Sequence, residues 1–138
     1  MPIANRQQQF RQRFRPKYYN MRDFRKLEVW EQSIQLADLI YDITESFPKT
    51  ETYGITQQMQ RCAVSIPSNI AEGCSRDSER EFSRFIQIAL GSSFELETQL
   101  LIAKKRKYFS DGSSIFYLLE IIQKRLNALN NKLKANNQ

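Results

Sequence analysis

The strictest pattern in the sequence is a 4–3 repeat of apolar and small side chains. Seven positions follow it: Phe82, Ile86, Ala89, Ser93, Leu96, Leu100 and Ala103. Because an α-helix returns to the same face at this spacing, the repeat predicts a long helix with one buried side. A strict heptad period favours left-handed packing at small crossing angles. The repeat therefore restricts the chain to a bundle of nearly parallel helices.

Both ends of this helix carry recognisable signals. Ser78 and Glu81 form a capping box at its start. Its last turn holds four cations, Lys104, Lys105, Arg106 and Lys107. These either compensate the helix dipole or form a patch that contacts phosphates. In the middle, Ser92 and Ser93 beside Gly91 would let another helix approach closely.

A second helix is predicted over Gln57–Glu72, with Thr56 as its N-cap and Gly73 as its C-terminal stop. Its apolar arc consists of Ile55, Met59, Cys62, Ala63, Ile66, Ile70 and Cys74. Pro67 lies inside the helix and leaves the carbonyl of Ala63 without its usual donor. We expect a kinked continuous helix, and two short helices are the alternative.

The opposite side of this helix carries small uncharged side chains where a surface helix normally carries Lys and Glu. We therefore expect another helix or another subunit to cover it. The predicted structural and interface motif is Ser65, Pro67, Ser68, Asn69, Glu72 and Gly73, with Ser92 and Ser93 from the third helix. Ser65 and Asn69 can satisfy backbone groups near Pro67. The alternatives are a direct ligand or nucleic-acid contact through Ser68, Asn69 and Glu72, or catalysis, for which Glu72 has no partner at useful spacing.

Two further helices complete the bundle. The first starts near Phe24–Leu27 and ends by Ser46, before Pro48. Its two stripes are Leu27, Trp30, Ile34, Ala37, Tyr41 and Thr44, and Leu36, Ile40, Ile43 and Phe47. The last helix is capped by Ser113 or Ser114, has the stripe Ile115, Leu118, Ile122, Leu126, Leu129 and Leu133, and frays over residues 134–138. The predicted fold is an all-α, antiparallel up-down-up-down four-helix bundle with a kinked second helix.

The positive charge is concentrated in an N-terminal arm. Residues 1–22 hold Arg6, Arg11, Arg13, Arg15, Lys17 and Arg22 and no acid, whereas residues 23–138 hold 15 basic and 15 acidic side chains. We expect a mobile basic arm over 1–22 and the bundle over 23–138. Phe10, Phe14 and Tyr18 interleave with the arginines, so the arm can neutralise phosphates and stack on bases. A solvated tail and a transit peptide are the alternatives.

Several classes of function have little support in the sequence. Histidine is absent, which removes Ser–His and Cys–His nucleophilic sites and His-ligated zinc, and no Gly-rich phosphate loop occurs. Cys62 and Cys74 are expected to be buried free thiols rather than a disulfide. No apolar run approaches the roughly 18 residues of a membrane span. We therefore expect a cytoplasmic protein that is not an enzyme and has no metal or cofactor.

Three stretches together resemble a known bacterial family. They are FRKLEVW at 24–30, AVSIPSNIAEG at 63–73 and IALGSSFELET at 88–98. They are similar to the four-helix-bundle proteins encoded in intervening sequences of 23S ribosomal-RNA genes, and the resemblance covers about residues 24–134. It implies a bundle that assembles into a homopentamer without established enzymatic activity. That family in turn resembles the accessory variability determinant of diversity-generating retroelements, a basic pentamer that binds a reverse transcriptase and nucleic acid.

The resulting prediction is a non-enzymatic, oligomeric bundle that binds RNA or DNA phosphates largely through its arm. The candidate binding residues are the six arm cations, Arg6, Arg11, Arg13, Arg15, Lys17 and Arg22, with Lys104, Lys105, Arg106 and Lys107. The alternative is an accessory scaffold that docks a partner enzyme such as a reverse transcriptase.

Overall fold

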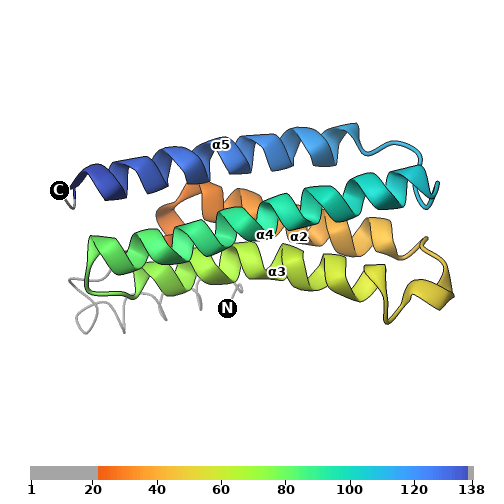
Figure 1. The fold of residues 1–138 in the computed structure, drawn as a ribbon, viewed down its shortest axis with the longest axis horizontal. Helices are drawn as coiled ribbons and strands as arrows, with labels where there is room; N and C mark the ends of the chain where they lie inside the picture. The colour runs from red at the N-terminus through yellow and green to blue at the C-terminus, as the bar shows by residue number, and fades with distance from the viewer. Residues whose placement is uncertain (1–21, 137–138) are drawn as a thin grey trace, which may run out of the picture.

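The computed structural model describes residues 22–136, which form helices and turns without any strand. The elements are η2 (Phe24–Lys26), α2 (Glu28–Thr44), η3 (Lys49–Glu51), α3 (Ile55–Cys74), α4 (Glu79–Lys105) and α5 (Ser113–Asn136). Figure 1 shows α2 and α4 running in one direction and α3 and α5 in the other. The predicted all-α, up-down-up-down four-helix bundle is confirmed.

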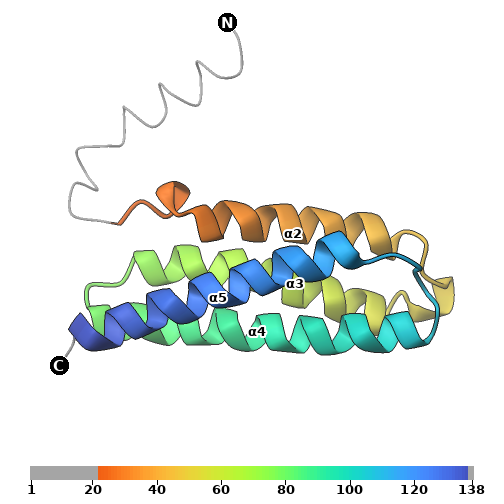
Figure 2. The same cartoon turned by 90° about the horizontal axis from the view of Figure 1, so that it is seen from above.

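The four long helices surround one core. Going round the bundle, α2 packs on α3, α3 on α4, α4 on α5, and α5 back on α2. Figure 2 shows this arrangement from above. Apolar side chains from all four helices join in a single buried cluster on the shared axis. Each helix therefore keeps one outer face for solvent or for a partner.

Helix α4 follows the sequence pattern closely. All seven positions of the 4–3 repeat, from Phe82 to Ala103, are buried. At its start the backbone N–H of Glu81 donates to the Ser78 hydroxyl at 3.1 Å, which is the first bond of the predicted capping box.

Helix α3 is continuous through Pro67, and six of its seven predicted arc positions are buried while Ile55 is half-buried. The predicted N-cap was wrong, because Gly54 takes that position and the Glu51 carboxylate accepts from the N–H of Ile55 at 3.4 Å. The predicted stop at Gly73 was also wrong, since the helix continues to Cys74. The degree of any kink at Pro67 stays a prediction.

Gly73 serves close packing rather than helix termination. None of the glycines in the described part of the chain has a positive φ. A Cβ added to Gly73 would lie 2.8 Å from the Phe82 ring and 2.9 Å from the Cβ of Phe85. The missing side chain therefore lets the end of α3 approach the first turns of α4.

Helix α2 departs most from its predicted stripes. Ile34 and Tyr41 are 44% and 46% exposed. The buried residues of the helix and of the turn after it are Val29, Ser33, Leu36, Ile40, Thr44 and Phe47. Of these, only Val29 and Ser33 lie outside the predicted stripes. Ser33 and Thr44 can take buried positions because their hydroxyls donate to the carbonyls of Trp30 and Ile40.

Helix α5 buries a polar residue that the predicted leucine stripe passed over. Leu119 and Asn130 are buried, whereas Leu118 and Leu129 are only partly buried. The Ser83 hydroxyl donates to the Asn130 side-chain oxygen at 2.6 Å, so both polar groups are satisfied inside the bundle.

The ends of α5 also differ from the prediction. Ser113 is the first helical residue rather than the cap, and its N–H donates to the Asp111 carboxylate at 3.0 Å. The helix continues to Asn136, so residues 134–136 do not fray as predicted.

Candidate functional site

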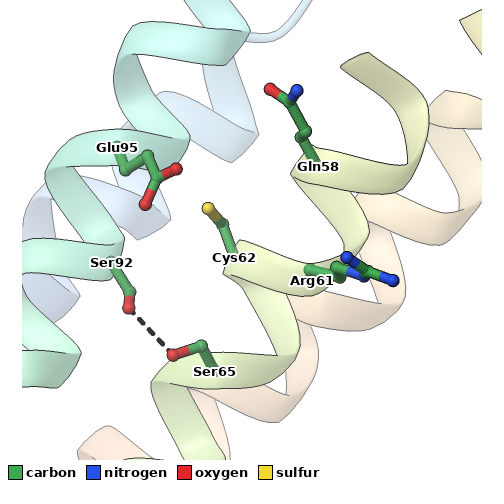
Figure 3. Close-up of a pocket in the computed structure, with 6 residues that line it drawn as sticks. All are labelled: Gln58, Arg61, Cys62, Ser65, Ser92 and Glu95. Carbon is green, nitrogen blue, oxygen red and sulfur yellow. Dashed lines mark hydrogen bonds between the residues drawn. The ribbon is translucent and has the colours of Figure 1, made fainter. Parts of the chain in front are cut away.

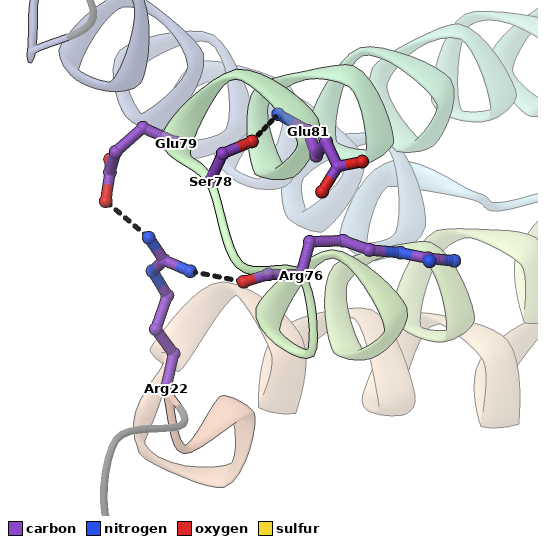
Figure 4. A network of polar contacts seen from close by, with 5 residues as sticks. All are labelled: Arg22, Arg76, Ser78, Glu79 and Glu81. Atoms are coloured by element: carbon purple, nitrogen blue, oxygen red, sulfur yellow. Dashed lines mark hydrogen bonds and ion pairs between the residues drawn. The ribbon is translucent and has the colours of Figure 1, made fainter.

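The end of the candidate arm is fixed to the bundle at the turn between α3 and α4. The Arg22 guanidinium pairs with the Glu79 carboxylate and donates to the backbone carbonyl of Arg76 at 3.1 Å (Figure 4). It also lies 4.8 Å from the centroid of the Phe82 ring. Arg22, proposed from sequence as a nucleic-acid contact, is thus engaged by three groups of the bundle.

The other candidate cations belong to two segments of the sequence, the arm and the end of α4. Arg6, Arg11, Arg13, Arg15 and Lys17 lie outside the described residues. Lys104, Lys105, Arg106 and Lys107 lie at the far end of α4 from Arg22 (Figure 1). Because α4 has 27 residues, the two ends are about 40 Å apart at 1.5 Å per residue. Residue spacing alone did not indicate that Arg22 and the cations of α4 would lie at opposite ends of one helix.

The cations at the end of α4 lie in a regular helix terminus. Lys107 has φ of 61°, its N–H donates to the carbonyl of Lys104, and the N–H of Tyr108 donates to that of Ala103, both at 3.0 Å. These two bonds define a Schellman motif. All four cations are exposed, and the Lys104 ammonium lies 5.6 Å from the Phe116 ring centroid. The arrangement suits dipole compensation and leaves the charges accessible.

Three of the motif's polar side chains meet where α3 packs on α4. The hydroxyls of Ser65 and Ser92 are hydrogen-bonded at 2.9 Å. The Asn69 amide donates to the Ser65 carbonyl at 2.8 Å and to the Ser65 hydroxyl at 2.9 Å. The backbone group satisfied near Pro67 is therefore the Ser65 carbonyl, whereas the proline frees that of Ala63. This side of α3 is covered in part by α4.

The remaining motif residues are distributed between core and surface. Pro67, Gly73 and Ser93 are buried, and the Ser93 hydroxyl donates to the Leu90 carbonyl. Ser68 is exposed. Glu72 is exposed and pairs with Arg76 at 3.0 Å, one helical turn later. The motif thus contributes mainly to packing between α3 and α4.

A shallow depression lies beside the Ser65–Ser92 contact. Gln58, Arg61, Cys62, Ser65, Ser92 and Glu95 line it (Figure 3). Its volume is about 260 Å³, below the roughly 300–1,000 Å³ usual for small-molecule pockets. Sequence reasoning did not identify Glu95 as a neighbour of Cys62, because residue spacing does not relate the register of α3 to that of α4. Gln58 lies one turn before Cys62 on the same helix.

The thiols are poorly suited to nucleophilic chemistry. Burial, together with the nearby Glu95 carboxylate, raises the pKa of Cys62 to about 11. Burial likewise raises the pKa of Cys74 to about 11. Both sulfurs are free and buried, as predicted, so the protonated and unreactive form dominates at neutral pH.

The described residues offer few other chemical sites. Among them, no three His, Cys, Asp or Glu side chains lie close enough together to hold a metal ion. None of the helices in this part of the chain is long and apolar enough to cross a membrane.

The comparisons with known proteins point to one family. The model described as "23S rRNA-intervening sequence protein" matches residues 25–128. A solved structure of a protein of unknown function from the S23 ribosomal protein family of Bacteroides thetaiotaomicron is also similar. It shares 22% identity with a TM-score of 0.56, over 78% of this chain and 95% of that one. No curated protein matches the chain.

Proposed function

Because the chain belongs to the 23S rRNA-intervening sequence protein family, we propose that it is a non-enzymatic, oligomeric bundle that binds RNA or DNA. The contacts are made to phosphates, largely by the basic arm over residues 1–21. The proposed role is binding rather than catalysis.

The observation that carries the proposal is the division of charge. Residues 1–22 hold six cations and no acid, and the rest of the chain is balanced at 15 of each sign. Arg22 is used in holding the arm to the turn between α3 and α4. Five cations therefore remain to neutralise phosphates: Arg6, Arg11, Arg13, Arg15 and Lys17.

Self-association would multiply this charge. The outer side of α4 carries four half-exposed apolar side chains, Ile88, Phe94, Leu101 and Ile102. Gly91 lies among them, and its position has open space around it. Such a face supports contact with a second copy. A pentamer, which the family resemblance implies, would bring 25 arm cations together and raise affinity by multivalency. Light scattering that gives only monomers at micromolar concentration would contradict the oligomer.

The test is the salt dependence of binding to a single-stranded RNA oligonucleotide. Each neutralised phosphate contributes about 0.7 to the slope of log affinity against log salt on a single strand. Replacing Arg11, Arg13 and Arg15 by Ala should therefore reduce the slope by about 2 per chain. Deleting residues 1–21 should abolish most of it while leaving Arg22 in place.

The matched control removes the same number of cations from the opposite end of the bundle. Lys104→Ala, Lys105→Ala and Lys107→Ala together should leave the slope nearly unchanged. A slope that falls equally in both triple variants would assign the binding to the whole basic surface instead. An unchanged slope after deletion of the arm would refute the proposed role of the arm.

The alternative is an accessory scaffold that docks a partner enzyme such as a reverse transcriptase. The same half-exposed apolar side chains of α4 favour it, because a partner could cover them in place of a second copy. Recovery of a reverse transcriptase by the tagged protein after nuclease treatment would support this function. If a Phe94→Ser, Leu101→Ser variant no longer recovers the reverse transcriptase, the contact lies on α4.

A further inference from the structure

The outer face of α2 is acidic along its whole length. The helix contains Glu28, Glu31, Asp38 and Asp42, Glu45 follows directly, and neither Lys nor Arg occurs between residues 28 and 45. Glu28 pairs with Arg125 of α5. The other four are exposed, and within residues 22–136 none of them has an ion-pair partner. Although the bundle is neutral overall, one helix thus carries a concentrated negative charge.

Apolar side chains accompany this charge where α2 meets α3. Ile34 and Tyr41 lie seven residues apart on α2, and therefore on the same side of it, at 44% and 46% exposure. Val64 of α3 is 42% exposed. A depression of about 420 Å³ lies between the two helices. It is lined by Tyr41, Gln57, Gln60, Arg61, Val64 and Ser65. We call this surface, with Ile34 and the four acids, the α2–α3 groove.

The N-terminal arm has the complementary composition. Residues 1–21 contain five cations and no acid. The α2–α3 groove contains four acids that have no ion-pair partner among the described residues. Phe10, Phe14 and Tyr18 recur every fourth residue, and Arg11 and Arg15 directly follow the first two. On the α2 side of the groove, apolar side chains likewise lie beside charges of the opposite sign, whereas Arg61 on the α3 side has the same sign as the arm. We propose that the α2–α3 groove is the docking site of the chain's own N-terminal arm.

The attachment point of the arm makes this occupant favourable. Arg22 is held at the bundle end where η2 leads into α2, and η2 contacts both α2 and α3. Helix α2, with 17 residues, is about 26 Å long. The 21 residues before Arg22 span up to about 70 Å when extended, so they can cover the entire groove. Linkage within one chain gives an effective concentration of order millimolar, which a separate partner must exceed.

Docking of the arm would regulate the proposed binding function. The arm cations cannot neutralise the acids of α2 and nucleic-acid phosphates at the same time. The apparent affinity for nucleic acid is then reduced in proportion to the fraction of free arm. This consequence rests on the proposed function, whereas the docking itself does not.

Photo-crosslinking of the full chain tests the docking. With p-benzoylphenylalanine in place of Phe14, crosslinks should form to the tryptic peptides 27–49 and 62–76, which contain Tyr41 and Val64. Ile34→Ser with Tyr41→Ser should reduce their yield several-fold. The control is Phe94→Ser with Leu101→Ser, a pair of similar exposure and the same spacing on α4, which should leave the yield unchanged. No crosslink to these peptides, or equal yields in both double variants, would overturn the proposal.

Isotope labelling distinguishes the chain's own arm from that of a second copy. The probe-bearing chain is unfolded and refolded together with a large excess of nitrogen-15-labelled chain without the probe. Crosslinks to unlabelled peptides support docking within one chain. Crosslinks predominantly to labelled peptides would show that the groove takes the arm of another copy, and would refute the assignment made here.

The regulatory consequence has its own measurement. Glu31→Gln, Asp38→Asn and Asp42→Asn should raise RNA affinity several-fold and lower the crosslink yield. The control removes three negative charges outside the groove, by Glu95→Gln, Glu97→Gln and Glu120→Gln. It should have a smaller effect on RNA affinity and none on the crosslink yield. Equal gains in affinity would show a general charge effect and refute competition. Absence of RNA binding in every variant, with the crosslinks intact, would refute the proposed function alone.

Discussion

Two helical glycines permit a direct measurement of how closely α3 approaches α4. Gly73→Ala and Gly91→Ala make the same chemical change inside a helix. Through the higher helix propensity of alanine, each change should raise the free energy of unfolding by about 1 kcal/mol. At Gly91 an added Cβ meets no heavy atom of the described residues within 4 Å. Gly91→Ala should therefore stabilise the protein by about that amount.

Gly73→Ala carries an additional cost. Its Cβ would lie 2.8 Å from the ring of Phe82 and 2.9 Å from the Cβ of Phe85, so one helix must shift. Overpacking of this kind costs about 1–3 kcal/mol, which offsets or exceeds the gain in propensity. The free energies of unfolding of the two variants should differ by about 1–3 kcal/mol, equivalent to about 3–12 °C in melting temperature for a chain of this size.

Urea denaturation followed by circular dichroism provides the comparison, with the denaturant slope checked for constancy. Gly91 lies on the proposed contact face of α4, so the measurement is repeated at several protein concentrations to separate folding from association. Equal free energies of unfolding in the two variants, at all concentrations, would refute the close-packing role of Gly73.

Three other changes test separate features. Lys107→Gly should stabilise by about 1 kcal/mol, since glycine relieves the left-handed backbone at φ of 61°, and a melting temperature unchanged or lowered would contradict this. Asn130→Ala should cost about 1–3 kcal/mol in urea denaturation, because the Ser83 hydroxyl loses its acceptor inside the bundle, and a neutral result would show that another acceptor replaces it. Cys62 and Cys74 keep their protons to a pKa of about 11 in the fold but ionise near 9 when unfolded, so stability should fall as pH rises from 9 to 11. The loss should be smaller in a Cys62→Ala, Cys74→Ala variant, and an equal loss in both proteins would assign it to other groups.

The sequence predicted best where one physical signal dominated. The 4–3 repeat of α4 allowed a single buried face, and all seven of its positions are buried. The apolar arc of α3 was equally clear despite Pro67. In α2 two neighbouring apolar stripes were predicted, and periodicity alone could not show that Ile34 and Tyr41 would be half exposed while Ser33 was buried. The Ser33 hydroxyl donates to the backbone carbonyl of Trp30, a contact that a hydropathy pattern does not show.

The candidate site was less accessible to sequence reasoning. The small polar residues of α3 indicated a covered face, and Ser65 and Ser92 do meet between α3 and α4. Gly73 was interpreted as a helix stop because glycine commonly ends helices, whereas its use here depends on Phe82 and Phe85 of another helix. The one signal that could have revealed the α2–α3 groove was the absence of any cation between residues 28 and 45. Total charge concealed it, because the surplus cations of α5 and those just after α4 offset the acids of α2.

Helix α4 separates the turn that holds Arg22 from the exposed cations Lys104 to Lys107, and its length defines a scale for any polymer lying along the bundle. A duplex rises about 3.4 Å per base pair, so the length of α4, about 40 Å, corresponds to about 12 base pairs. A shorter duplex lying along the bundle could not reach both ends. Because the proposed binding is through the arm, a rise in affinity above this length would indicate that the cations of α4 also take part.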